Sequence, residues 1–141
     1  PDYSSAASDV YKRQEVLRLE SPVQSLMRAT AKDVELSGVT IPAGSLINIR
    51  FAAANRDERR FDNPDALDLD RPRAGGHMAF GSGKHHCLGA PLARRELHWS
   101  FKALVDRIDS MWFAKGKNDF SYHPHYLLRA MKSLHIEFKA K

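Results

Sequence analysis

The sequence predicts an α+β fold that is mainly helical and carries small antiparallel β-sheets, and three patterns support this prediction. Between positions 88 and 108, apolar residues recur at spacings of three and four, as on one face of an α-helix. Residues 34–51 alternate between apolar and polar types and are rich in β-branched side chains, which indicates strands. The tail has apolar residues at 127–128 and at every second position from 134 to 138, which predicts a terminal hairpin.

The first 14 residues open with Pro, Asp and small side chains and show little apolar rhythm. We interpret them as a flexible start and as a candidate non-native extension. Ser8 or Asp9 is the expected N-cap of a helix that continues through Arg18. This helix must end before Ser21-Pro22, because a residue that precedes proline avoids the helical region.

Turn residues divide the following segment into short elements. Gly38 interrupts the first strands, and a tight turn is expected at 42–44 (Pro-Ala-Gly) before the strand at 46–51. Residues 52–57 predict a short helix. Positions 61–77 hold two prolines, two glycines and many charges, which predicts a long irregular loop of the kind that is often functional.

The clearest helix is expected from Leu88 to about Ile108, with Pro91 in its first turn, where the missing N–H costs nothing. The chain has 141 residues, which fits one domain or a piece of one. No apolar run approaches the roughly 20 residues of a membrane span, and no signal peptide is recognisable. We therefore expect a cytoplasmic protein with no membrane partner.

The net charge of +5 comes from basic residues that are scattered among many acids. A solvated surface explains this pattern better than a nucleic-acid interface, so we expect no nucleic-acid partner. There is one cysteine, Cys87, which excludes an intrachain disulfide. A lone cysteine is usually a small buried hydrophobe, and its neighbours decide whether it has another role.

The neighbours of Cys87 are unusual. Gly81 and Gly83 precede it and allow the backbone to turn tightly and approach another body closely. The predicted long helix follows it, and free N–H groups at a helix start favour an anion such as a thiolate. Gly89 removes a side chain beside the sulfur, and Phe80 is placed to shield the site from water.

A thiolate in this setting has three uses: nucleophile, zinc ligand or iron ligand. A nucleophile needs a fixed base, and nothing marks His85 or His86 as one. The spacings of His77, His85, His86 and Cys87 do not match those of zinc sites. A single thiolate suffices on haem iron, because the porphyrin supplies the other four ligands.

The segment resembles the cysteine-ligand loop of cytochromes P450, Phe-x-x-Gly-x-(Arg/His)-x-Cys-x-Gly. Phe80, Gly83, His85, Cys87 and Gly89 meet every fixed position. The following residues, Ala-Pro-Leu-Ala-Arg-Arg-Glu at 90–96, also resemble the helix that comes after the ligand in soluble bacterial members.

A second motif supports the resemblance independently. Glu15-Val16-Leu17-Arg18 is similar to the Glu-x-x-Arg that P450s carry upstream of the cysteine, and its i to i+3 spacing puts both side chains on one helix face. In the family this pair is buried and structural. The segments at 54–57 and 67–72 resemble the short helix before the family's irregular meander and the end of that meander, so the resemblance covers about residues 15–141.

The resemblance implies a role for each matching residue. Cys87 would be the axial ligand of haem b, and His85 and Arg28 would contact the haem propionates. The other implied cofactor-binding residues are Phe80, Gly81, Gly83, Leu88, Gly89 and Ala93. The residues implied to line the substrate pocket are Val23, Gln24, Ser25 and Leu26 and, in the tail turn around Tyr126, Leu127 and Leu128. No role is implied for His77, His86, His123 or His125, which we expect to be exposed.

Two departures from the family pattern stand out. Many relatives complete the Glu–Arg cluster with an arginine in the meander, but Ala66 occupies the expected position here, and Arg71 and Arg56 remain as alternatives. The family's central oxygen-activating helix, with its Ala-Gly-x-x-Thr-like segment, has no counterpart. We therefore interpret residues 15–141 as the C-terminal, haem-ligating part of a P450 domain, truncated at its N-terminus.

The family implies a haem-thiolate monooxygenase that uses O₂ to oxidise a small apolar molecule. The chain has no G-x-G-x-x-G fingerprint, so its electrons must come from a partner, typically a small acidic ferredoxin. Lys84, Arg94 and Arg95 are candidate contacts for that partner, with a solvated face as the alternative. We expect this chain by itself to be inactive. The other classes considered are a non-catalytic haem-binding module and a zinc- or nucleic-acid-binding protein.

Overall fold

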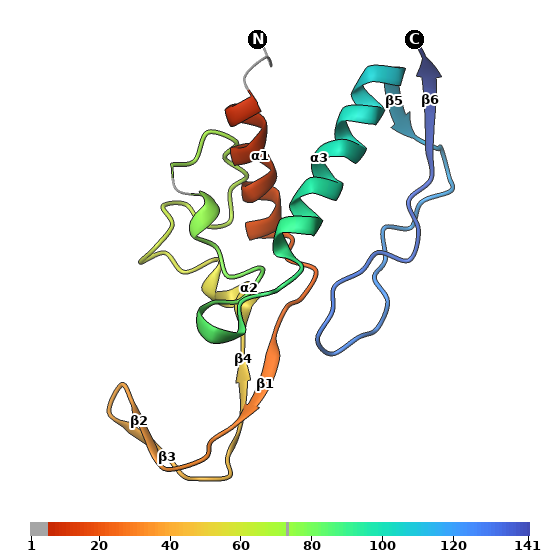
Figure 1. Ribbon diagram of the computed structural model, residues 1–141. Coiled ribbons are helices and arrows are strands. Elements are labelled where there is room, and N and C mark those ends of the chain that lie inside the picture. The colour runs from red at the N-terminus through yellow and green to blue at the C-terminus, as the bar shows by residue number, and fades with distance from the viewer. Residues whose placement is uncertain (1–5, 73) are drawn as a thin grey trace. The chain divides into compact units, whose positions relative to one another are not determined.

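The computed structural model describes residues 6–72 and 74–141, and its described side chains cover 13–72 and 75–141. Contacts divide the chain into two compact units. Unit 1 comprises the chain up to Ala79 together with His125–Arg129. Unit 2 comprises Phe80–Pro124 and Ala130–Lys141. Figure 1 shows the elements of each unit.

Unit 1 begins with helix α1, which spans Ala6–Leu19. The helix starts earlier than predicted, and Ser8 and Asp9 lie inside it rather than at its N-cap. Alanines at its start, which favour helix, explain the difference. Its end before Ser21-Pro22 is confirmed. The first five residues of the expected flexible start lie outside the described part of the chain.

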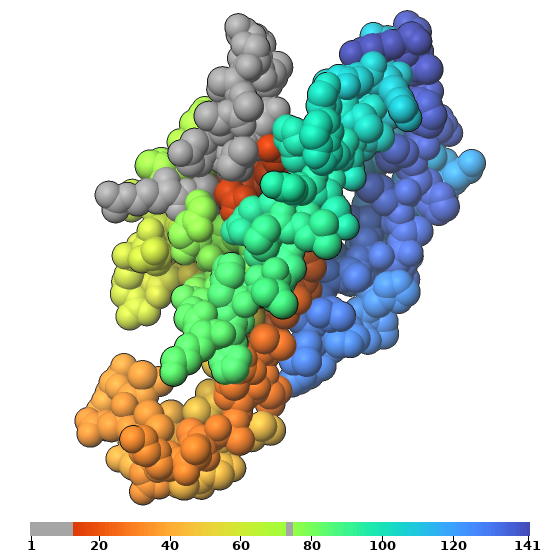
Figure 2. Space-filling view, in the orientation of Figure 1, coloured from red at the N-terminus to blue at the C-terminus, as the bar shows by residue number. Residues whose placement is uncertain are grey.

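Two antiparallel strand pairs of unit 1 are nested in one another. Strand β1 (Leu26–Ala29) pairs with β4 (Leu46–Ile49), and the hairpin of β2 (Val34–Leu36) and β3 (Val39–Ile41) lies between them in the chain. Figure 2 shows this hairpin projecting from the rest of unit 1. The strands at 34–49 were predicted, whereas β1 was not.

The predicted turn at 42–44 is present, but it does not connect two paired strands. The Ser45 N–H donates to the Pro42 carbonyl at 3.2 Å, and Gly44 has a φ of +79°. This turn leads from β3 to β4 without pairing them. The hairpin turn itself lies at Ser37 and Gly38, with φ of 50° and 79°, a left-handed conformation that suits glycine.

The interior of unit 1 is unusually polar. Helix α2 (Phe51–Ala54), close to the predicted short helix, and the 3₁₀ turn η1 (Ala74–Gly76) complete its elements. Phe51, Phe61 and Ala79 are buried, but the largest fully buried side chains are polar. They are Arg18, Glu15, Asn55, Ser21 and Ser25. Buried polar groups are tolerated only when they are paired, so this interior has to be a hydrogen-bonded network.

Unit 2 contains the 3₁₀ turn η2 (Gly83–His85), helix α3 (Ala90–Arg107) and strands β5 (Ile108–Phe113) and β6 (Ile136–Ala140). The predicted long helix is confirmed with Pro91 in its first turn, although Ile108 already begins β5. The predicted terminal hairpin is wrong in its partner. β6 pairs antiparallel with β5, from Phe113↔Ile136 to Ile108↔Ala140, and Leu128 instead bridges to Val23 in unit 1.

The described residues do not form a mainly helical structure, so that part of the predicted fold class is wrong. The three α-helices contain 14, 4 and 18 residues, and most of the remaining chain is loop, turn or short strand. The long irregular segment at 61–77 accounts for much of the difference. No described helix is both long enough and apolar enough to cross a bilayer.

Candidate functional site: a buried charge cluster and the cysteine loop

Glu15 and Arg18 form a buried ion pair one turn apart on α1. Arg18 donates from Nε to Glu15 Oε2 at 2.8 Å and from Nη2 to Oε1 at 2.7 Å, and both side chains are fully buried. This two-point geometry is the strong form of an arginine–carboxylate pair. Arg18 also stacks over the Phe61 ring, 5.0 Å from its centroid.

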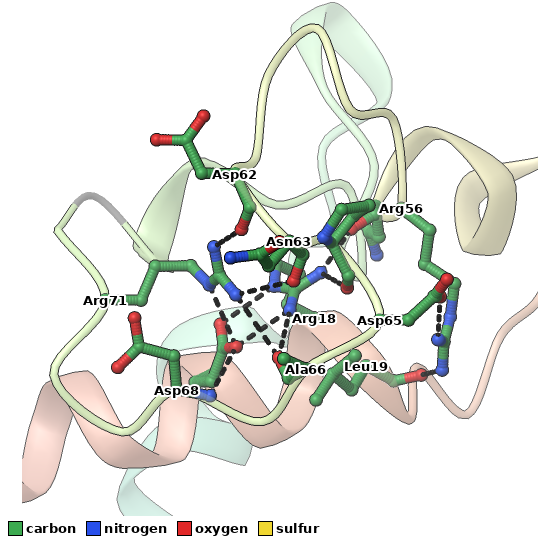
Figure 3. Close-up of polar contacts among 12 residues, drawn as sticks. Arg18, Leu19, Arg56, Asp62, Asn63, Asp65, Ala66, Asp68 and Arg71 are labelled. Carbon is green, nitrogen blue, oxygen red and sulfur yellow. Dashed lines mark hydrogen bonds and ion pairs between the residues drawn. The ribbon is translucent and has the colours of Figure 1, made fainter.

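Arg71 completes this cluster from the loop after α2 (Figure 3). Its Nε donates to Glu15 Oε1 at 3.0 Å, and its Nη2 donates to the carbonyls of Asn63 and Ala66 at 3.1 and 3.2 Å. Arg71 Nη1 donates to the Asp62 carbonyl. The sequence left open whether Arg71 or Arg56 is the third member of the Glu–Arg cluster, and the structure shows that it is Arg71.

The other residues considered for this role act differently. Arg56 pairs with Asp65 at 2.5 Å, and more than a third of its side chain is exposed. Ala66 contributes its main-chain carbonyl, which accepts from both Arg18 and Arg71. Arg18 Nη1 donates to the carbonyls of Asn55 and Pro64, each at 2.7 Å. The two buried guanidinium groups therefore tie the loop at 62–66 to α1.

The charge cluster controls the ionisation of Glu15. Burial opposes a carboxylate, but hydrogen bonds from Arg18, Arg71 and the Asp68 amide outweigh it and lower the pKa of Glu15 from 4.5 to about 2. Glu15 is therefore ionised at neutral pH. The cluster carries one negative and two positive groups, and main-chain carbonyls accept the remaining guanidinium donors.

Asn55 and His77 belong to the same buried interior, and sequence reasoning assigned them no role. The Asn55 side chain is fully buried, and its Nδ2 donates to Ser21 Oγ at 2.8 Å. His77 is 8% exposed and hydrogen-bonded to Gln14, so its predicted exposure is wrong. His86, His123 and His125 are exposed as expected. No local signal marks these partners, because they come from distant segments.

The cysteine loop lies in unit 2, directly before α3. Cys87 is a free, exposed cysteine whose N–H donates to the Phe80 carbonyl at 2.8 Å, and its own carbonyl accepts from Ala90 N–H at 3.2 Å. These two bonds close the loop at its base and connect it to the first residue of the helix. Gly81 and Gly83 have φ of 70° and 71°, so the loop uses the backbone freedom that glycine provides.

The sulfur lies next to the Gly89 backbone. A Cβ at Gly89 would be 3.8 Å from Cys87 Sγ, in ordinary contact. Leu88 is 97% exposed and His85, on η2, is also exposed, whereas Ala93 is half-buried. The loop thus presents a thiol and several uncovered side chains.

The donor set around Cys87 fits a haem better than a zinc ion. Within the described part of the chain, no group of three or more His, Cys, Asp or Glu side chains is placed to hold a metal ion. A zinc site takes three or four protein ligands. Haem iron accepts a single axial thiolate, and Cys87 offers one exposed thiol.

The Phe80 ring makes a cation–π contact with Arg94. The Arg94 guanidinium lies over the Phe80 ring, 4.6 Å from its centroid, and His86 approaches the same ring edge-on at 6.4 Å. Three basic residues were predicted as contacts for an electron-donor protein. Lys84 and Arg95 are exposed, and Arg94 is half-buried against Phe80.

The two segments expected to line a substrate pocket lie side by side in unit 1. Val23 and Leu128 form an antiparallel bridge, and Gln24 N–H donates to the Leu127 carbonyl at 2.8 Å. Arg129 N–H donates to the Pro22 carbonyl at 2.8 Å, and its side chain pairs with Glu20 at 2.9 Å.

The remaining residues expected at the pocket differ in exposure. Ser25 is buried, and Leu26 and Leu127 are half-buried. Arg28 lies on β1, exposed, with Nη1 donating to the Met27 carbonyl.

A protein-family model described as Cytochrome P450 matches residues 14–136. The chain belongs to the cytochrome P450 family. It is 37% identical over 127 residues to the cytochrome P450 monooxygenase PikC of Streptomyces venezuelae, which covers 89% of this chain and 30% of PikC. The predicted family resemblance is confirmed.

Solved P450 structures agree with this membership. The substrate-free cytochrome P450 CYP150A6 of Mycobacterium marinum matches with a TM-score of 0.90 and 37% identity, over 96% of this chain and 35% of that one. CYP109E1 of Bacillus megaterium in complex with corticosterone matches with a TM-score of 0.84 and 34% identity, over 92% of this chain and 34% of that one. The chain thus spans about a third of the P450 structures it resembles.

Proposed function

We propose that this chain is the haem-ligating part of a P450 monooxygenase and that Cys87 is the axial thiolate ligand of haem b. The observation that carries the proposal is the exposed thiol at the base of a hydrogen-bonded, glycine-rich loop that leads into α3. When bound, haem supplies the activation of O₂, and a thiolate ligand favours cleavage of the O–O bond.

The chain's own residues would hold and orient the cofactor. His85 and Arg28 would donate to the haem propionates, since both are exposed donors. Phe80, Gly81, Gly83, Leu88, Gly89 and Ala93 would form the wall next to the ligand. Glu15, Arg18 and Arg71 would keep the loop at 62–66 attached to α1. None of these three contacts the reacting atoms in this proposal.

The substrate would be a small apolar molecule. Val23 and Gln24 pair with Leu128 and Leu127 along the main chain, so the segments at 23–26 and 127–128 can contribute to a single surface. The related CYP109E1 is known in complex with corticosterone, an apolar steroid, which supports this class. Electrons would come from a ferredoxin-type donor, for which exposed Lys84 and Arg95 offer positive charge.

Ligation is testable with this chain, haem, a reductant and CO. A thiolate-ligated ferrous–CO complex gives a red-shifted Soret band, and we expect this band for the unmodified chain and its loss in Cys87→Ser. Circular dichroism of both proteins controls for folding. Persistence of the band in Cys87→Ser, or no haem uptake by the unmodified chain, overturns the ligand assignment.

A non-catalytic haem-binding module is the second candidate, because the exposed thiol and the glycine-rich loop would serve ligation without turnover equally well. The two functions separate in a turnover assay with a ferredoxin, its reductase and an apolar substrate such as a steroid. Formation of a hydroxylated product supports the monooxygenase. Haem binding through Cys87 without any product supports the module.

A further inference from the structure

Residues 77–79, which directly precede the cysteine loop, are held by buried side chains from two other parts of unit 1. Met78 N–H donates to Asn55 Oδ1 at 2.6 Å. Ala79 N–H donates to His77 Nδ1 at 3.1 Å, and the other ring nitrogen of His77, Nε2, lies 2.8 Å from Gln14 Oε1. Asn55, His77 and Gln14 are each more than nine-tenths buried. We call these three residues the 77–79 clamp.

The hydrogen bonds define how His77 acts within the clamp. Nδ1 accepts the Ala79 N–H, so it carries no proton of its own. Nε2 therefore carries the ring proton and donates it to Gln14 Oε1 on α1. In this arrangement His77 connects α1 to the main chain at Ala79, and Gln14 sets the orientation of the ring.

Asn55 uses both halves of its amide. Oδ1 accepts from Met78, Nδ2 donates to Ser21 Oγ at 2.8 Å, and the Asn55 carbonyl accepts from Arg18 at 2.7 Å. Only an amide offers an acceptor and a donor at these two positions without a charge. Asn55 thus connects the end of α2 and the charge cluster to Met78.

The far end of the loop is closed separately, because Cys87 N–H donates to the Phe80 carbonyl. Phe80 is the residue directly after Ala79. The main chain from 77 to Cys87 is therefore restrained at its start by the clamp and at its base by this bond. Phe80 is therefore the point in the chain at which the restrained residues 77–79 meet the closed loop.

We propose that Asn55, His77 and Gln14 are positioning residues for the cysteine ligand, in that they fix the point at which the loop leaves unit 1. This inference rests on the proposed function of Cys87. A merely structural role predicts a different result, because loss of buried polar contacts would then loosen unit 1 in general and would not act on the loop selectively.

The first test uses the chain without haem and measures amide hydrogen exchange. Asn55→Ala and Ser21→Ala both lose the Asn55–Ser21 bond, but only Asn55→Ala releases Met78. We expect exchange at Met78 and through 80–87 to be about tenfold faster in Asn55→Ala than in Ser21→Ala. Exchange in α3 should match in the two variants. Equal exchange at Met78 and in the loop overturns the proposal.

Gln14→Leu provides a second variant if Asn55→Ala does not fold, because it removes the acceptor of His77 and leaves the Met78 bond in place. We expect faster exchange at Ala79 than in Ser21→Ala. Exchange at Ala79 equal to that in Ser21→Ala contradicts a clamp that includes His77.

The second test uses haem and separates the two proposals. With haem and CO, the clamp variants should show a several-fold smaller fraction of the red-shifted Soret band, whereas Ser21→Ala should resemble the unmodified chain. Absence of the band in the unmodified chain defeats the proposed function, and exchange alone then decides on the clamp. Presence of the band at equal strength in all four proteins defeats the clamp.

Discussion

Arg71 Nε lies 3.0 Å from Glu15 Oε1, although 56 positions separate the two residues in the sequence. This contact turns the Glu15–Arg18 pair on α1 into a three-membered cluster. It also fixes the loop at 62–66, whose carbonyls accept from both arginines. The cluster therefore connects α1 to the irregular part of unit 1.

Replacing Glu15 with Gln should strongly destabilise the chain. Arg18 and Arg71 would remain buried without a carboxylate, and breaking a buried pair in this way costs about 3–5 kcal/mol. Urea unfolding followed by circular dichroism measures the change in the free energy of unfolding. The matched control is Asp65→Asn, which breaks the exposed Arg56 pair and should cost less than about 1 kcal/mol. Similar costs for the two variants would contradict the structure.

The same cluster predicts how stability depends on pH. The folded-state pKa of Glu15 is about 2, below its usual 4.5, so its ionisation stabilises the folded state at and above pH 4.5. This contribution, about 3 kcal/mol, should be lost progressively as pH falls from 4.5 to 2. Unfolding curves over this range measure it. In Glu15→Gln the acid slope should be shallower, and an unchanged slope would rule out Glu15 as its source.

The tail turn should loosen when the Gln24 N–H is removed. Gln24→Pro deletes the donor to the Leu127 carbonyl, whereas Gln24→Ala keeps it. We expect amide exchange at Arg129, whose N–H bonds to the neighbouring Pro22 carbonyl, to rise about tenfold only in the proline variant. Equal protection of Arg129 in both variants would show that the tail turn is held by other contacts.

Gly83→Ala should destabilise the folded chain because of the backbone conformation at this position, and not because of a steric clash. A Cβ at Gly83 meets nothing within 4 Å, but its φ of +71° is left-handed, so we expect a cost of roughly 1–2 kcal/mol. Gly75 has equal space and no such φ, and Gly75→Ala should be neutral or slightly stabilising. Urea unfolding of the two variants checks this difference in sign.

Sequence reasoning was reliable where the signal is local. The helix at 90–107 follows from apolar residues three and four apart, and the end of α1 follows from Pro22. The family was recognisable from ten residues around Cys87, because the glycine turns and the candidate ligand of that loop all lie within them. The cofactor and pocket roles of individual residues remain predictions.

Sequence reasoning failed where partners come from far along the chain. β6 pairs with β5, and Leu128 with Val23, because both pairings depend on the path of intervening loops. The expectation of a mainly helical fold failed for a similar reason: the loop at 61–77 has little periodicity, and the buried arginines organise it instead.

By itself, the sequence determined the family, the cysteine that is the candidate ligand, and the helices and turns whose residues are neighbours in the chain. Only the tertiary structure decided that Arg71 completes the charge cluster and that His77 and Asn55 are buried and accept hydrogen bonds from Ala79 and Met78. The physical reason is that periodicity and turn residues act over a few positions. A buried charge or amide, in contrast, is satisfied by whichever distant group the folded chain brings within hydrogen-bonding distance.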